Sequence, residues 1–227
     1  MQNIDWRGVF PALTTKFNAN GDIDWDAMAR HLDFQLEAGV HGLIVLGSLG
    51  ENATLSMDEK LEMVRFMGEQ DRRGRPLVAC IAESSTRDAK YFAGAAADAG
   101  ADAFMLLPPM RYTSDRRETM AYLADVANAS RCPIMLYNNP VAYGTDLSPE
   151  DFARLGDNAK FEAIKESAAD TRRFSDIRRL CGDRFALYCG VDDLAFECFA
   201  LGAVGWVAGL VVAFPRESVR LWELCME

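Results

Sequence analysis

The chain has 227 residues, half of them hydrophobic, and a formal net charge of −10 at pH 7. This length and apolar content suffice for the core of a single domain over residues 1–227. Acidic and basic residues are interspersed without a basic run, which argues against nucleic acid or an anionic membrane surface as a partner. No apolar stretch approaches the roughly 20 residues that span a bilayer and no signal peptide opens the chain, so we expect a cytoplasmic protein.

Short apolar runs alternate with longer amphipathic ones along the chain. The expected strands, in chain order, are residues 8–13, 42–46, 77–81, 103–107, 134–137, 161–165, 186–189 and 205–207. The expected helices are residues 24–38, 56–72, 86–99, 115–129, 148–155, 171–180 and 193–201, with a last one from about residue 216. Eight strands alternating with eight helices predict an α/β fold, a (β/α)8 TIM barrel. An open doubly wound sheet is the alternative, although no G-x-G-x-x-G motif follows the first strand.

A helix-to-strand joint recurs three times, which supports the barrel. Each joint places a glycine at the end of a helix and begins a strand two or three residues later, at Gly39, Gly100 and Gly202. Glycine is favoured there because it can adopt the positive φ that ends a helix. The start of one helix is also readable, because Ser56 and Glu59 fit a capping box.

The residue inventory limits the chemistry. The six cysteines show no C-x-x-C spacing, which favours a reduced protein with neither disulfides nor a zinc site. His31 and His41 are the two histidines of the chain, so a Ser-His-Asp triad or a multi-histidine metal site has almost no material. We expect no metal and no organic cofactor, and acid–base work must fall to Lys, Tyr, Asp, Glu or Cys.

Two strand ends carry the strongest candidates for catalysis. Tyr137 closes the strand at 134–137, and Lys165 closes the strand at 161–165. In a barrel the loops after the strands build the active site, so the phenol and the amine are expected at one rim. Desolvation disfavours the charged form of an amine, and the neutral form attacks a carbonyl, so the pair suits Schiff-base chemistry on a 2-oxo acid. A lone lysine after a strand is more often solvated, and its coincidence with Tyr137 is what favours a functional role.

Five segments in one order make the chain similar to a known family. They are residues 8–15 (GVFPALTT), 47–51 (GSLGE), 137–140 (YNNP), 164–167 (IKES) and 190–193 (GVDD). The chain resembles the dihydrodipicolinate synthase / N-acetylneuraminate lyase family of Schiff-base-forming barrels. The resemblance covers nearly all of the chain and implies a homo-oligomer, a tetramer or a dimer, with additional C-terminal helices that this chain does not show.

The resemblance implies roles for individual residues. Lys165 would form the imine with the keto group of pyruvate or a longer 2-oxo acid, and Tyr137 would shuttle protons. Ser48, with the backbone N–H groups around Gly47 and Leu49, would hold the substrate carboxylate. Turn geometry explains the glycines of this loop equally well.

We expect four further residues to contact substrate: Asn139, Gly190, Val207 and Arg111. Arg111 could receive a distal carboxylate, although a solvated loop arginine is an equally good interpretation.

Three departures from the family pattern weaken an assignment to 4-hydroxy-tetrahydrodipicolinate synthesis. Ala142 stands where such a synthase would carry an arginine for its second substrate. Leu49 follows Ser48 where two threonines are usual, and Arg111 replaces a tyrosine that a neighbouring subunit would lend to the proton relay. The sequence therefore favours a dehydratase or deaminase branch, such as pyrroline-4-hydroxy-2-carboxylate deaminase or deoxy-sugar-acid dehydratase. The alternatives are a 4-hydroxy-tetrahydrodipicolinate synthase or N-acetylneuraminate lyase-like aldolase, and a non-catalytic 2-oxo-acid-binding protein.

Overall fold

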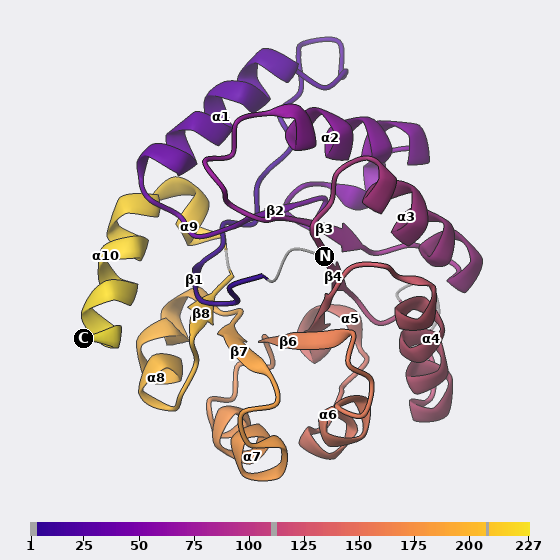
Figure 1. Ribbon diagram of the computed structural model, residues 1–227, viewed down its shortest axis with the longest axis vertical. Helices are drawn as coiled ribbons and strands as arrows, with labels where there is room; N and C mark the ends of the chain where they lie inside the picture. Colours follow the sequence, from indigo (N-terminus) through magenta and orange to yellow (C-terminus); the bar gives the residue numbers. More distant parts are fainter. Residues whose placement is uncertain (1–3, 110–112, 208) are drawn as a thin grey trace.

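Parallel strands run through the middle of the molecule, and helices form a ring around them (Figure 1). The computed structural model describes residues 4–109, 113–207 and 209–227. The strands are β1 (Gly8–Val9), β2 (Leu43–Val45), β3 (Leu77–Ile81), β4 (Ala103–Leu106), β5 (Ile134–Asn138), β6 (Phe161–Glu166), β7 (Ala186–Cys189) and β8 (Gly205–Trp206). The helices are α1 (Trp25–Glu37), α2 (Met57–Glu69), α3 (Thr86–Asp98), α4 (Arg116–Ala129), α5 (Pro140–Tyr143), α6 (Pro149–Leu155), α7 (Arg172–Cys181), α8 (Ala195–Ala200), α9 (Leu210–Ala213) and α10 (Pro215–Met226).

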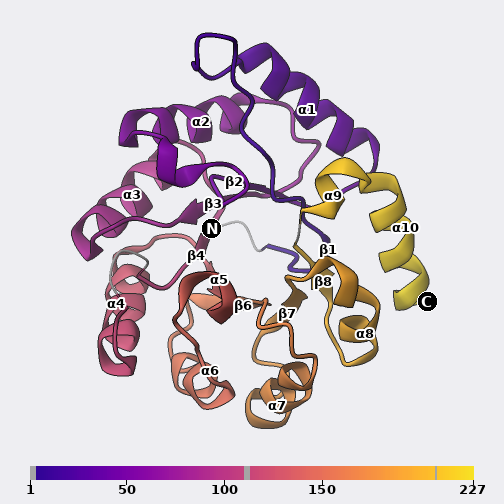
Figure 2. The same cartoon turned by 180° about the vertical axis from the view of Figure 1, so that it is seen from behind.

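The sheet follows the order of a barrel. Its strands are hydrogen-bonded in the order β1-β8-β7-β6-β5-β4-β3-β2, all parallel. A parallel bridge between Ala12 and Ile44 joins the two ends of this order, supported by a 2.8 Å hydrogen bond from the Leu13 N–H to the Ile44 carbonyl. The helix ring closes at the same place, because α10 lies next to α1 in both views (Figures 1 and 2). The predicted TIM-barrel-like α/β fold is confirmed.

Local signals account for most of the element boundaries. Ser56 caps α2 in a reciprocal capping box with Glu59, as predicted. The glycines of the three repeated joints all have positive φ, at 84° for Gly39, 111° for Gly100 and 97° for Gly202. α2 ends at Glu69, three residues before the predicted end, because the chain turns extended there.

The interior of the barrel is packed with side chains. Trp6, Phe10 and Tyr188 form an aromatic cluster in which the Phe10 and Tyr188 rings meet edge to face at 5.3 Å. Gly205 leaves room for Tyr188, since a Cβ there would lie 2.2 Å from the Tyr188 ring. None of the helices in the described part of the chain is long and apolar enough to cross a bilayer.

Candidate active site

Lys165 and Tyr137 lie side by side at the ends of two neighbouring strands. β5 and β6 pair in a register that puts Tyr137 directly beside Lys165. Both side chains are buried, with 7% of Tyr137 and 6% of Lys165 exposed. The Lys165 Nζ lies 3.9 Å from the centre of the Tyr137 ring. The structure thus brings together the amine and the phenol that the sequence singled out, while their chemical roles stay predictions.

The two residues face a cavity of about 110 Å³ at this rim of the barrel. The described residues that line it are Ala12, Gly47, Ser48, Leu49, Met105, Tyr137, Lys165, Gly190, Asp192 and Gly209. Most of the predicted substrate-binding residues are therefore on its walls. Val207 is not: it is fully buried beyond the end of β8, with its N–H bonded to the Cys189 carbonyl at 2.9 Å. Arg111 lies outside the described residues.

Gly190 allows Lys165 to take this position. A Cβ at Gly190 would lie 1.8 Å from the Ser167 Oγ and 3.0 Å from both Cγ and Cε of Lys165. These distances are shorter than normal contacts between heavy atoms, so only glycine fits without a shift. The predicted importance of this position therefore has a steric cause: the backbone after β7 approaches the stem of the lysine.

Tyr143 is a site residue that the sequence did not indicate. It ends the short helix α5, and its hydroxyl is hydrogen-bonded to the Ser48 hydroxyl across the rim. Its ring meets the Tyr137 ring edge to face, with centroids 5.7 Å apart and planes at 86°. The one available signal for α5 is local: Pro140 occupies the first turn of the helix, and Gly144, at φ 70°, ends it.

Asn139 orients both tyrosines. Its Oδ1 accepts the Ala142 N–H at 3.0 Å and so caps α5, which carries Tyr143. Its Nδ2 donates to the Tyr137 hydroxyl at 3.1 Å. Both the oxygen and the nitrogen of the Asn139 amide therefore bind groups of the protein itself, and its predicted contact with substrate stays a prediction.

Comparison with known proteins agrees with this geometry. The sequence profile of the dihydrodipicolinate synthetase family matches residues 5–227. The chain belongs to the dihydrodipicolinate synthetase family. This family member is an enzyme, a lyase of the class I aldolase type that acts on small molecules.

Named relatives align over almost the whole chain. The 4-hydroxy-tetrahydrodipicolinate synthase of Methanothrix thermoacetophila is 36% identical over 217 residues, which are 95% of this chain and 73% of that protein. The synthase of the same name from Nitrosococcus oceani is 34% identical over 220 residues, 97% of this chain and 74% of that protein. Among solved structures, dihydrodipicolinate synthase from Acinetobacter baumannii complexed with pyruvate has a TM-score of 0.93 and 27% identity, covering 97% of this chain and 76% of that one.

The surroundings of the two tyrosines in this family member push their pKa values apart. Burial raises the pKa of Tyr137, but the charge of Lys165 and the side chains of Asn139 and Tyr143 outweigh it, so the net shift is downward. Burial, together with the negative charge that Tyr137 can carry, raises the pKa of Tyr143 well above its ordinary value. Tyr137 is therefore the phenol that ionises first, and Tyr143 is the one that keeps its proton.

A polar cluster on the outer side of β5 and β6 supports the same strand ends. The Asn138 Nδ2 donates to both carboxylate oxygens of Glu166, at 3.2 and 3.0 Å, and the Ala168 N–H donates to Glu166 at 2.7 Å. Arg173 lies 3.8 Å from the same carboxylate. Burial raises the pKa of Glu166 to about 7, against the opposing effect of these donors.

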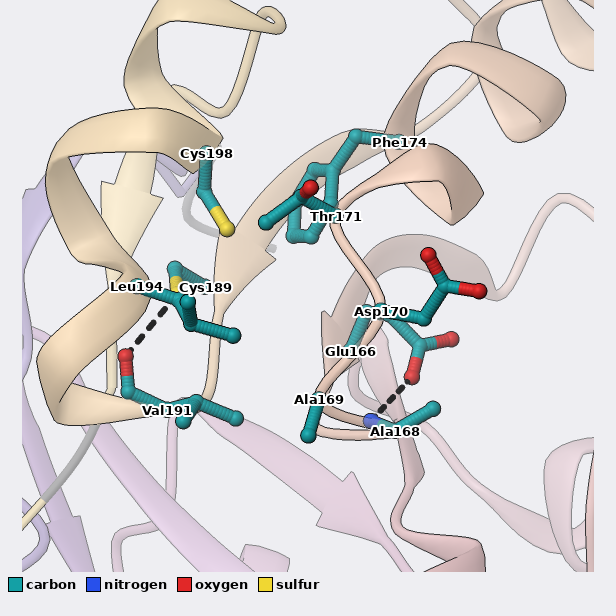
Figure 3. A pocket seen from close by; sticks show the side chains of 10 residues that line it. All are labelled: Glu166, Ala168, Ala169, Asp170, Thr171, Phe174, Cys189, Val191, Leu194 and Cys198. Carbon is teal, nitrogen blue, oxygen red and sulfur yellow. Dashed lines mark hydrogen bonds between the residues drawn. The ribbon is translucent and has the colours of Figure 1, made fainter.

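Glu166 also borders a second, much smaller cavity of about 10 Å³ (Figure 3). Figure 3 shows the carboxylates of Glu166 and Asp170 on one side and the thiols of Cys189 and Cys198 on the other. A space of this volume holds about one water molecule, so it is too small for a 2-oxo acid. Of these two cavities, the one beside Lys165 suits a small substrate.

Proposed function

We propose that this lyase forms an imine between Lys165 and the keto carbon of pyruvate, or of a 2-oxo acid derived from pyruvate. The observation that carries this proposal is the buried Lys165 amine, 3.9 Å from the Tyr137 ring on the wall of a cavity of about 110 Å³. An amine held away from water next to a phenol has both the nucleophile and the acid–base partner that imine formation requires. A relative of the same fold has been solved in complex with pyruvate, which supports the same substrate class here.

The cavity also offers groups to hold the substrate carboxylate. Ser48, Gly47 and Leu49 all line it, so the Ser48 hydroxyl and the backbone N–H groups of its two neighbours are the proposed donors. Once the imine is protonated it withdraws electrons from C3, so that C3 can lose a proton or the bond between C3 and C4 can break. Tyr137 supplies and removes the protons of these steps. No metal or organic cofactor is part of this proposal.

The names of the relatives favour condensation of pyruvate with a second carbonyl compound. The two relatives described above are both named 4-hydroxy-tetrahydrodipicolinate synthase, which was the alternative interpretation of the sequence. Synthesis of this kind is therefore the first candidate for the overall reaction.

The residues of the site favour a second candidate, dehydration or deamination of a hydroxylated 2-oxo acid or cyclic imine. Ala142, where family synthases are expected to carry an arginine, is exposed and uncharged. Among the described residues that line the cavity, Lys165 is the one cation and Asp192 the one anion. A second substrate with a carboxylate would then lack a further cationic partner among these lining residues, whereas a neutral hydroxylated chain would not need one. Arg111, outside the described residues, stays the predicted partner for a distal carboxylate. Assembly into a homodimer or homotetramer and a cytoplasmic location stay predictions from the sequence.

Borohydride reduction in the presence of pyruvate, followed by peptide mass mapping, tests the proposed imine. We expect a stable adduct on Lys165, no adduct in Lys165→Ala, and an unchanged adduct in Lys90→Ala, which removes an exposed lysine on α3. A folded wild-type protein without an adduct at Lys165 would overturn the proposal and favour a non-catalytic binding protein. Turnover of pyruvate with an aldehyde, against loss of water or ammonia from hydroxylated 2-oxo acids and cyclic imines, then separates the two candidate reactions.

A further inference from the structure

We propose that Tyr143 is a positioning residue that acts through Tyr137: its hydroxyl passes protons between Tyr137 and Ser48, so that the proton relay of the site is complete within one chain. This inference rests on the proposed imine chemistry of Lys165. It differs from the expectation drawn from the family resemblance, in which a neighbouring subunit lends a tyrosine at the position of Arg111.

The geometry places Tyr143 between the buried phenol and the solvent-facing serine. Its hydroxyl is hydrogen-bonded to the Ser48 hydroxyl, and its ring stands edge to face against Tyr137 at 5.7 Å. Ser48 is exposed, whereas only 7% of Tyr137 is exposed. A hydrogen bond from the Tyr143 side chain also helps to lower the pKa of Tyr137, so a proton that reaches Tyr137 from solvent would pass over the Ser48 and Tyr143 hydroxyls of the same chain.

The short helix α5 holds Tyr143 in this position. α5 has only four residues, and two local devices fix it: the Asn139 side chain caps its start, and Gly144 at φ 70° ends it directly after Tyr143. The same Asn139 donates to the Tyr137 hydroxyl at 3.1 Å. The cap thus couples the position of α5 to the orientation of the phenol that Tyr143 would serve.

The electrostatics decide which of the two phenols ionises. The pKa of Tyr137 is lowered and that of Tyr143 is raised, by the causes described above. A Tyr137 phenolate is therefore stabilised beside a Tyr143 hydroxyl that still carries its proton. Transfer from Tyr143 to a Tyr137 phenolate alone would run against these pKa values, so in the relay Tyr143 gives up its proton only as it takes one from Ser48, and its raised pKa keeps it neutral between transfers.

The protons and bonds of imine formation balance with the groups of this relay. The Lys165 amine adds to the keto carbon, and one of its protons moves to the former keto oxygen. The resulting carbinolamine loses its hydroxyl as water with a proton from Tyr137. The carbon–oxygen bond breaks as the carbon–nitrogen double bond of the protonated imine forms. Tyr137 regains a proton from Tyr143, Tyr143 from Ser48, and Ser48 from a solvent acid, so the water that leaves carries one proton from the amine and one that entered from solvent.

Tyr143→Phe tests the relay, because it keeps the ring against Tyr137 and removes the hydroxyl alone. Rapid quench-flow mixing of the protein with pyruvate, in which borohydride traps the imine after a set time, gives the rate constant of imine formation at each pH. We expect this constant to fall about 10- to 100-fold, a part of the usual contribution of acid–base catalysis, with the pyruvate concentration for half-saturation changed by less than about threefold. We also expect the alkaline limb of the pH profile to move to higher pH, because the Tyr143 side chain contributes to the lowered pKa of Tyr137.

Tyr91→Phe is the matched control, since Tyr91 is an exposed tyrosine on α3 and should leave the rate and the pH profile unchanged. A rate within about threefold of wild type for Tyr143→Phe, with an unshifted limb, would overturn the inference. A slower rate without a shifted limb would mean that Tyr143 only supports the fold of α5, which also overturns it. If the wild-type protein forms no adduct at Lys165, it is the proposed function that fails.

Discussion

Replacing Gly190 with alanine would push a methyl group into the space that Ser167 and Lys165 occupy. The new Cβ would lie 1.8 Å from the Ser167 Oγ and 3.0 Å from Cγ and Cε of Lys165. Ser167 can rotate away, because its buried hydroxyl has no hydrogen-bond partner among the described residues. The lysine stem cannot avoid the contact so easily: carbon atoms prefer about 3.5–4.0 Å, so it must shift by about 0.5–1 Å.

The expected cost has two parts that separate measurements can resolve. Overpacking of this kind lowers the free energy of unfolding by about 1–3 kcal/mol, which urea denaturation measures. A displacement of about 1 Å at a reacting group costs about 100-fold in rate, which borohydride trapping of the pyruvate imine measures. Gly47→Ala is the packing control, since its Cβ would meet only the Met105 Cε at 3.9 Å, and its free energy of unfolding should stay within about 0.5 kcal/mol of wild type.

A double variant separates the serine from the lysine. Gly190→Ala combined with Ser167→Ala relieves the shortest contact, so we expect it to regain much of the lost stability while imine formation stays slow. A Gly190→Ala protein that is destabilised but traps pyruvate at about the wild-type rate would refute the reasoning. The position of the Lys165 stem would then not limit its chemistry.

Three further predictions concern the groups around the strand ends. Burial raises the pKa of Glu166 from 4.5 to about 7, so between these pH values the folded chain holds a proton that the unfolded chain has lost. The free energy of unfolding should therefore fall by about 3 kcal/mol as pH rises from 4.5 to about 7, as measured by urea denaturation at several pH values, and Glu166→Gln should flatten this dependence. Asn139→Ala should cost about 1 kcal/mol through the lost cap of α5 and move the alkaline limb of imine formation to higher pH, since Asn139 helps to lower the pKa of Tyr137. Lys60→Met should cost about 3–5 kcal/mol because it leaves the Glu83 carboxylate buried and unpaired, whereas Lys60→Met with Glu83→Gln should cost much less in the same denaturation assay.

The fold was predictable because the hydrophobic pattern that indicates each strand or helix extends over the whole element. Strands buried on both faces form apolar runs, and helices of ten or more residues show their period, so each predicted strand and long helix has a counterpart in the structure. The strand ends were less predictable. Leu46, expected as the last residue of β2, has φ 61° and leaves the strand, which periodicity does not reveal.

The candidate site was predictable where it depends on strand ends and not where it depends on short helices. The positions of Lys165 and Tyr137 follow from the register of two apolar runs. α5 was missed because four residues complete barely one helical turn and show no period, so the position of Tyr143 escaped with it. Val207, expected at the site by the same strand-end rule, has a fully buried side chain, and its contact with substrate stays a prediction.

β5 and β6 each extend one residue beyond their predicted ends, and these two extra residues help to hold Tyr137 and Lys165 in register. Side chains alternate along a strand, so Tyr137 and Lys165 face the cavity while Asn138 and Glu166, paired in the next rung, face outward. There the Asn138 amide bridges the Glu166 carboxylate at 3.0 Å, and its Oδ1 accepts the Leu147 N–H at 2.9 Å. A slip of one residue would break these bonds and turn the amine and the phenol away from the cavity. Polar residues at a strand end thus carry two functions at once, since the inward pair does the proposed chemistry and the outward pair holds it in place.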